Sequence, residues 1–114
     1  MAFIKQGTTK SDEWKNYPTD LTADERSKTS GSYGGIFIDV NTSAAKFKNT
    51  PHYLASLQGT SSMWDVSGIN AVYDPTPEGF RIYLRWAGRN GLTKEKAIEF
   101  GWVIRWTGIE DRGQ

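Results

Sequence analysis

The sequence has 114 residues and no cysteine, and His52 is its single histidine. The missing cysteines exclude disulfide scaffolds, thiolate zinc sites and cysteine nucleophiles. There is no Gly-x-Ser-x-Gly motif, no calcium-binding loop and no phosphate-binding glycine loop. Catalysis by a nucleophile, a histidine and an acid would have to use His52, which we interpret as a strand residue at the surface. We therefore expect no enzyme activity, no metal and no cofactor.

Excess charge and long apolar runs are also missing. Lys and Arg number 14 and Asp and Glu number 13, which gives a net charge of +1. Binding to nucleic acid through bulk charge is not expected, nor is membrane insertion, since no run approaches the roughly 18 apolar residues of a membrane span. The first ten residues lack the pattern of a secretory signal. We expect synthesis in the cytoplasm and leave open an action at a surface or outside the cell.

Aromatic residues and glycine are abundant instead. Phe, Trp and Tyr make up 13% of the chain, and there are 12 glycines. Aromatic residues favour strands and glycines favour tight turns, so this composition is typical of a small all-β domain. The length fits one domain over residues 1–114. We expect a polar N-terminal arm (1–35) packed on a sandwich core (36–110).

Period-two alternation begins at residue 36 and predicts the strands. The clearest pair covers residues 80–86 and 100–106, where large apolar residues alternate with polar or small ones. Further strands are predicted at 36–40, 52–58 and 69–73, with a turn at 74–79 and a helical turn or long loop at 94–99. The sum is an antiparallel β-sandwich of about six strands, with an open barrel as the alternative.

The arm carries two weaker signals. Thr22 and Glu25 have the spacing of a capping box, which predicts a short helix. Trp14 and Tyr17 are expected to be buried against the body and to hold the arm to it.

Two segments together resemble a known family. Tyr73-Asp-Pro-Thr-Pro-Glu-Gly-Phe-Arg-Ile-Tyr-Leu-Arg-Trp86 and Trp102-Val-Ile-Arg-Trp-Thr-Gly-Ile-Glu110 resemble the H-type lectin domain, the family of the snail agglutinins and of the discoidin C-terminal domain. The shared features are a tyrosine, a Pro-x-Gly-Phe turn that opens a strand, and a closing strand with tryptophan and Ile-Glu. The resemblance implies a β-sandwich, a trimer that is sometimes doubled to a hexamer, and binding of galactose or N-acetylgalactosamine between protomers.

The resemblance also implies positions for a sugar site. Phe100 matches the family's last aromatic residue, and Asp24 is the nearest candidate for its acid. Ser67 stands near the family's arginine, while Ala87 and Gly88 stand at its Trp-His pair. Trp86 reaches that pair with a shift of one residue, although its alternation with Phe80, Ile82 and Leu84 favours a core role.

A second group of candidates comes from the loops. Trp64 stands beside Asp65 in a polar loop, and this combination suits a saccharide; the alternative is that Trp64 folds over the end of the sandwich as a plug. Arg89 and Asn90 follow Trp86 and could supply hydrogen bonds, or Asn90 could simply form a turn with Gly91.

The leading hypothesis is therefore a multivalent lectin that binds glycans without turning them over. The alternative is a structural or oligomerisation module of a phage tail or surface appendage. In an oligomer, one outward strand face should lie partly at an interface, with Glu110 or Asp111 of a neighbour as acid partners. That face is expected to contain Arg81, Tyr83, Arg85, Val103 and Arg105.

Overall fold

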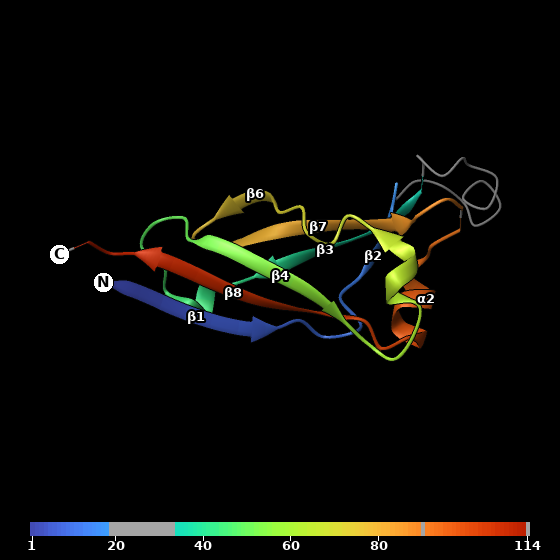
Figure 1. Ribbon diagram of the computed structural model, residues 1–114, viewed down its shortest axis with the longest axis horizontal. Coiled ribbons are helices and arrows are strands. Elements are labelled where there is room, and N and C mark those ends of the chain that lie inside the picture. Colours follow the sequence, from blue (N-terminus) through green and yellow to red (C-terminus); the bar gives the residue numbers. More distant parts are fainter. Residues whose placement is uncertain (19–33, 90, 114) are drawn as a thin grey trace.

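A computed structural model describes residues 1–18, 34–89 and 91–113. Two antiparallel sheets pack into a sandwich (Figure 1), so the predicted all-β sandwich is confirmed. The first sheet has the order β1 (Ala2–Thr8), β8 (Val103–Asp111) and β4 (His52–Gln58). The second sheet has the order β2 (Lys15–Tyr17), β3 (Gly35–Asn41), β7 (Gly79–Trp86) and β5 (Val66–Ser67), with β6 (Tyr73–Thr76) also paired to β7. The helical segments are η1 (Ser43–Ala45), η2 (Met63–Asp65) and α2 (Lys94–Glu99).

The two strands with the clearest alternation supply the centre of each sheet. In β7 the inward residues are Phe80, Ile82, Leu84 and Trp86, and all four are buried. In β8 the inward side chains of Ile104 and Trp106 are buried in the same core. Apolar area removed from water on both inner faces stabilises the sandwich, and a one-residue slip would turn these side chains outward.

The strand β1 was not predicted by the pattern. Most of its residues remain at least partly exposed, and it holds its place by pairing with β8 along its whole length, from Ala2 against Asp111 to Thr8 against Arg105. Inward, the rings of Phe3 and Phe47 pack edge to face, with ring centroids 5.8 Å apart. The non-local ladder, rather than local alternation, therefore defines this strand.

The predicted strand at 69–73 is wrong. This segment connects β5 and β6, and it begins at Gly68, whose φ of 107° suits glycine. A side chain there would also be too close to Tyr83, because a Cβ on Gly68 would lie 2.3 Å from the Tyr83 carbonyl oxygen. The predicted turn at 74–79 begins later than expected, since β6 runs to Thr76 at the edge of its sheet, where Pro75 is tolerated.

The expected anchoring by Trp14 is confirmed, whereas full burial of Tyr17 is wrong. Trp14 is 2% exposed, and its indole Nε1 donates to the Trp102 carbonyl oxygen at 2.9 Å. Tyr17 is 48% exposed and stands edge-on to Tyr83 on the outer face of the second sheet. The predicted helix at Thr22–Glu25 lies outside the described residues.

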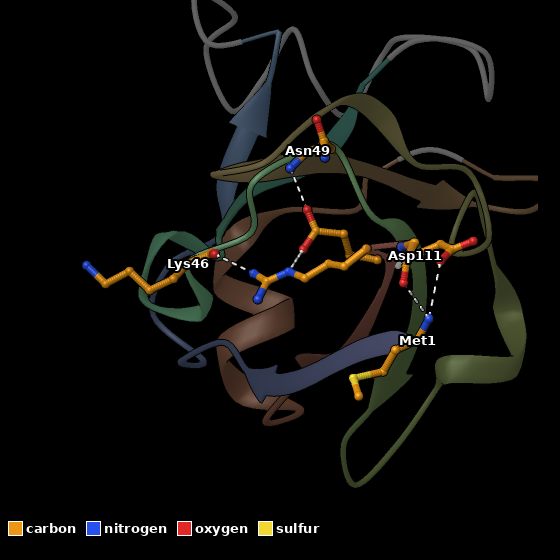
Figure 2. A network of polar contacts seen from close by, with 7 residues as sticks. Met1, Lys46, Asn49 and Asp111 are labelled. Carbon is orange, nitrogen blue, oxygen red and sulfur yellow. Dashed lines mark hydrogen bonds and ion pairs between the residues drawn. The ribbon is translucent and has the colours of Figure 1, made fainter.

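Both chain ends lie at one end of the sandwich (Figure 1), where Figure 2 shows a polar network. The Met1 amine donates to the Gly113 carbonyl oxygen at 3.0 Å and lies 3.8 Å from Asp111. The carboxylate of Glu110 is 2% exposed and accepts hydrogen bonds from the Asn49 backbone N–H at 2.5 Å and from Arg112 Nε at 2.6 Å. The opposite end carries η2 and α2. In the part of the chain described, no helix combines the length and apolarity needed to cross a membrane.

Candidate functional site

The loop at residues 59–65, called the Trp64 loop, is fixed at its base by contacts to the β8 side of the molecule. The Thr60 backbone N–H donates to the Phe100 carbonyl oxygen at 2.9 Å, and Trp102 Nε1 donates to the Ser61 carbonyl oxygen at 2.8 Å. Gly59 is required here, because a Cβ would lie 2.6 Å from Trp102 Cδ1. The loop therefore has a defined path before it reaches Trp64.

The indole of Trp64 is 94% exposed. The prediction that this side chain plugs the end of the sandwich is wrong, because its short helix η2 begins after Ser62, which has a φ of 67°, and presents the next residues to solvent. The other four tryptophans are between 0% and 8% exposed. A single indole is therefore open to a ligand.

Asp65 and Arg89 form an ion pair beside Trp64. Asp65 Oδ2 lies 3.0 Å from Arg89 Nη2, and the guanidinium lies 4.2 Å from the centroid of the Trp86 ring. The backbone supports the pair, since the Ala87 N–H donates to the Asp65 carbonyl oxygen at 2.9 Å. The ion pair therefore begins one residue along the chain from the exposed indole of Trp64.

Trp86 and Phe100 support the Trp64 loop and Arg89 from positions in or against the core. Trp86 is 5% exposed and packs edge-on to Trp102, with ring centroids 5.9 Å apart. Its burial agrees with the core role that the alternation favours, and Arg89 lies over its ring, so Trp86 offers no open face to a sugar. Phe100 is half-buried, packs on Trp102 and anchors the Trp64 loop through its carbonyl oxygen. Asp24 and Asn90, the remaining candidates, lie outside the described residues.

A second surface next to the Trp64 loop was missed by the sequence analysis. We call it the tyrosine hollow; it has a volume of about 810 Å³, and its lining includes Tyr17, Tyr73, Tyr83, Ser67 and Arg85. Tyr17 and Tyr73 both stand edge-on to Tyr83, with centroids 5.2 and 4.8 Å away. Ser67 follows Asp65 by two residues, so the hollow borders the Trp64 loop. The alternation in β7 predicts that Tyr83 faces outward. Local sequence does not show that β2 and β6 bring Tyr17 and Tyr73 close to it.

The expected interface does not form a single face. β7 and β8 belong to different sheets, so Arg81, Tyr83 and Arg85 lie on one outer face and Val103 and Arg105 on the other. Arg81 has an acid partner in its own chain, since its Nε lies 2.6 Å from Asp39 Oδ1. This hydrogen bond from Arg81 lowers the pKa of Asp39 and raises the pKa of Arg81 itself. Glu110, which was expected to serve a neighbour, is buried and bonded within its own chain.

The groups at this end of the molecule are ones that can contact a ligand directly. Among residues 1–18, 34–89 and 91–113, no group of three or more His, Asp or Glu side chains could hold a metal ion. The arrangement offers an exposed aromatic face, a fixed carboxylate and a fixed guanidinium. A small number of polar groups held in fixed positions beside aromatic surface is characteristic of small-ligand sites.

Comparison with known proteins returned no match, neither to a model of a protein family nor to a curated protein.

Proposed function

We propose that the protein is a non-enzymatic carbohydrate-binding lectin whose site is formed by Trp64, Asp65 and Arg89. The observation that carries the proposal is the 94% exposed indole of Trp64 next to the Asp65–Arg89 pair. Aromatic surface combined with a small number of polar groups in fixed positions is typical of small-ligand sites. A sugar matches both parts of this site, because its C–H groups cover an aromatic face and its hydroxyls pair with carboxylate and guanidinium.

The sugar class comes from the resemblance to H-type lectins, which implies galactose or N-acetylgalactosamine. The same resemblance implies multivalency through trimers or hexamers. Presenting several sites together raises avidity by about 10²–10⁴ over a single weak site. Glycans and further copies of the chain are therefore the proposed partners.

The five tryptophans give a direct assay. Acrylamide should quench Trp64 fluorescence strongly and the four buried indoles weakly, and a sugar that covers Trp64 should reduce this quenching. Titration with galactose, N-acetylgalactosamine and glucose would be followed in the wild type and in Trp64→Ala. We expect protection in the wild type with the first two sugars and no response in the variant. An oligosaccharide with terminal galactose that stays intact over long incubation would distinguish binding from hydrolysis, because the free monosaccharides have no glycosidic bond to break.

A glycan array would then test the position of the site. Trp64→Ala should lower binding by about 10–30-fold, as expected for an aromatic hot spot, while Tyr73→Ala in the tyrosine hollow should leave it unchanged. The reverse result would move the site into the hollow. A blank array from folded protein would instead support the alternative, a structural or oligomerisation module.

A further inference from the structure

The outer face of the first sheet, called the β8 face, is poor in charge and rich in exposed aliphatic surface. Two rows cross its centre in register: Ile4, Ile109 and His52, then Gln6, Thr107 and Leu54. Ile4 is 58% exposed and Leu54 is 52% exposed. Exposed apolar side chains grouped on a flat strand face mark an interaction surface.

Charge occurs on this face only at its two ends. Along the outward row of β8, Arg105 follows Val103 near one end and Asp111 stands at the other end. The remaining outward residues of β1, β8 and β4 are uncharged or His52. At about 3.3 Å per residue the two charges are roughly 20 Å apart. Asp111 Oδ1 lies 3.8 Å from the Met1 amine and accepts a hydrogen bond from the Gly113 N–H at 2.9 Å. The ion pair is exposed and therefore weak, and 88% of the Asp111 side-chain surface stays accessible to a neighbour.

This pattern is self-complementary in one arrangement. If two copies pack face to face with their β8 strands antiparallel, Arg105 of each copy meets Asp111 of the other at both ends. The row containing Ile109 then lies against the row containing Thr107 and Leu54, so the apolar centres cover one another. Such a two-fold contact uses the same patch on both subunits.

Other arrangements of the same face are disfavoured by the same charges. Parallel packing of two copies would bring Arg105 against Arg105, and a three-fold axis parallel to β8 would bring three of them to one level. Like charges placed opposite one another are unfavourable in an interface. The outer face of the second sheet differs in its charges, because Arg81 on that face is already paired with Asp39 of the same chain.

We infer that the β8 face is a two-fold interface that a second copy of this chain covers in antiparallel orientation. The contact does not depend on sugar binding. If trimers form through another surface, this contact joins two of them into a hexamer. The assembly therefore contains an even number of chains.

The first test is the mass of the full chain in solution at micromolar concentration, measured by light scattering coupled to gel filtration. We expect a dimer or a hexamer. A monomer or a trimer would overturn the inference. Leu54→Lys should halve the observed number of chains, while Ile98→Lys, at a comparably exposed site on α2 away from the face, should leave it unchanged. Equal masses for all three proteins would also overturn it.

A charge-swap series tests the orientation independently of folding. Arg105→Asp and Asp111→Arg should each weaken the association by about tenfold or more, because each places like charges together. The double variant should restore it. A double variant as weak as the singles would rule out the antiparallel arrangement. Melting curves would confirm that each variant is folded. The protection of Trp64 from acrylamide by a monovalent sugar should be the same in all variants, which keeps this test separate from that of the lectin proposal.

Discussion

The guanidinium of Arg89 lies 4.2 Å from the centroid of the Trp86 ring while its Nη2 lies 3.0 Å from Asp65 Oδ2. The last residue of β7, one residue of the loop that follows it and one residue of the Trp64 loop are thereby held together. For Asp65 and Arg89, the geometry predicts a role in ligand binding and only a small role in folding stability. Both charged side chains are partly exposed, with 58% and 41% of their surface accessible, and exposed ion pairs of this kind contribute little to folding.

Asp65→Asn should therefore weaken sugar binding and leave the fold intact. The substitution removes the charge that orients Arg89 and one strong acceptor for sugar hydroxyls. We expect about tenfold weaker binding with a change in unfolding free energy within about 0.5 kcal/mol. Binding would be measured by protection of Trp64 from acrylamide, and stability by urea denaturation.

Asp39→Asn is the matched control, because Asp39 also forms an exposed pair with an arginine, on the second sheet. It should leave sugar binding unchanged. If both variants bind as the wild type does, the Asp65–Arg89 pair has no part in recognition.

The buried carboxylate of Glu110 predicts acid sensitivity. Burial alone raises the pKa of this group, but hydrogen bonds from the Asn49 N–H and from Arg112 outweigh burial, and the pKa of Glu110 falls below its ordinary 4.5. The unfolded chain therefore takes up the proton at a higher pH than the folded chain. The stabilising contribution is present above pH 4.5 and is lost as the pH falls through that value to the folded pKa.

Melting temperatures of the wild type and Glu110→Gln, measured from pH 7 to pH 3, would test this. The variant should be less stable near neutral pH, and the difference should shrink as the pH falls. Glu78→Gln, at an exposed position, should follow the wild type throughout. A constant difference between wild type and Glu110→Gln over the whole range would show that the charge of Glu110 does not stabilise the fold.

At Gly108 in β8, the core leaves no room for a side chain. A Cβ at this position would lie 2.6 Å from Phe47 Cζ and 3.3 Å from Tyr53 Cε1. Gly108→Ala should therefore destabilise the protein by about 1–3 kcal/mol, the usual cost of overpacking. Phe47→Leu should relieve part of that cost, so the double variant should lose less stability than the sum of the two single variants. Additive losses in urea denaturation would contradict the contact.

Local pattern predicts the parts of the fold that alternation controls. The strands around Ile82 and Ile104 follow from sequence because one face of each must be buried. The strand at Ala2–Thr8 does not follow, because its residues are mostly exposed and its partner lies about 100 residues away. Local sequence carries no information about such pairing.

The candidate site also has features that local sequence predicts and features that it does not. Trp64 and Asp65 are adjacent in sequence and were predicted together, and Arg89 was predicted from its loop. Their assembly depends on long-range contacts, such as the bond from Trp102 to Ser61, which are 41 residues apart. Exposure of Trp64 follows from these contacts, so the sequence left open whether it was a plug or a ligand contact.

Trp14 offers a last test, because its bond to Trp102 joins the residue before β2 to the residue before β8. Trp14→Phe keeps an aromatic ring in the core but removes the donor at 2.9 Å from the buried Trp102 carbonyl oxygen. An acceptor left without this donor costs about 1–3 kcal/mol. Urea denaturation should show a lower midpoint with an unchanged slope, since the surface exposed on unfolding stays the same. Trp64→Phe, the same replacement at an exposed indole, should leave the midpoint unchanged. Equal midpoints for both variants would mean that ring packing, without the hydrogen bond, holds β2 to the sandwich.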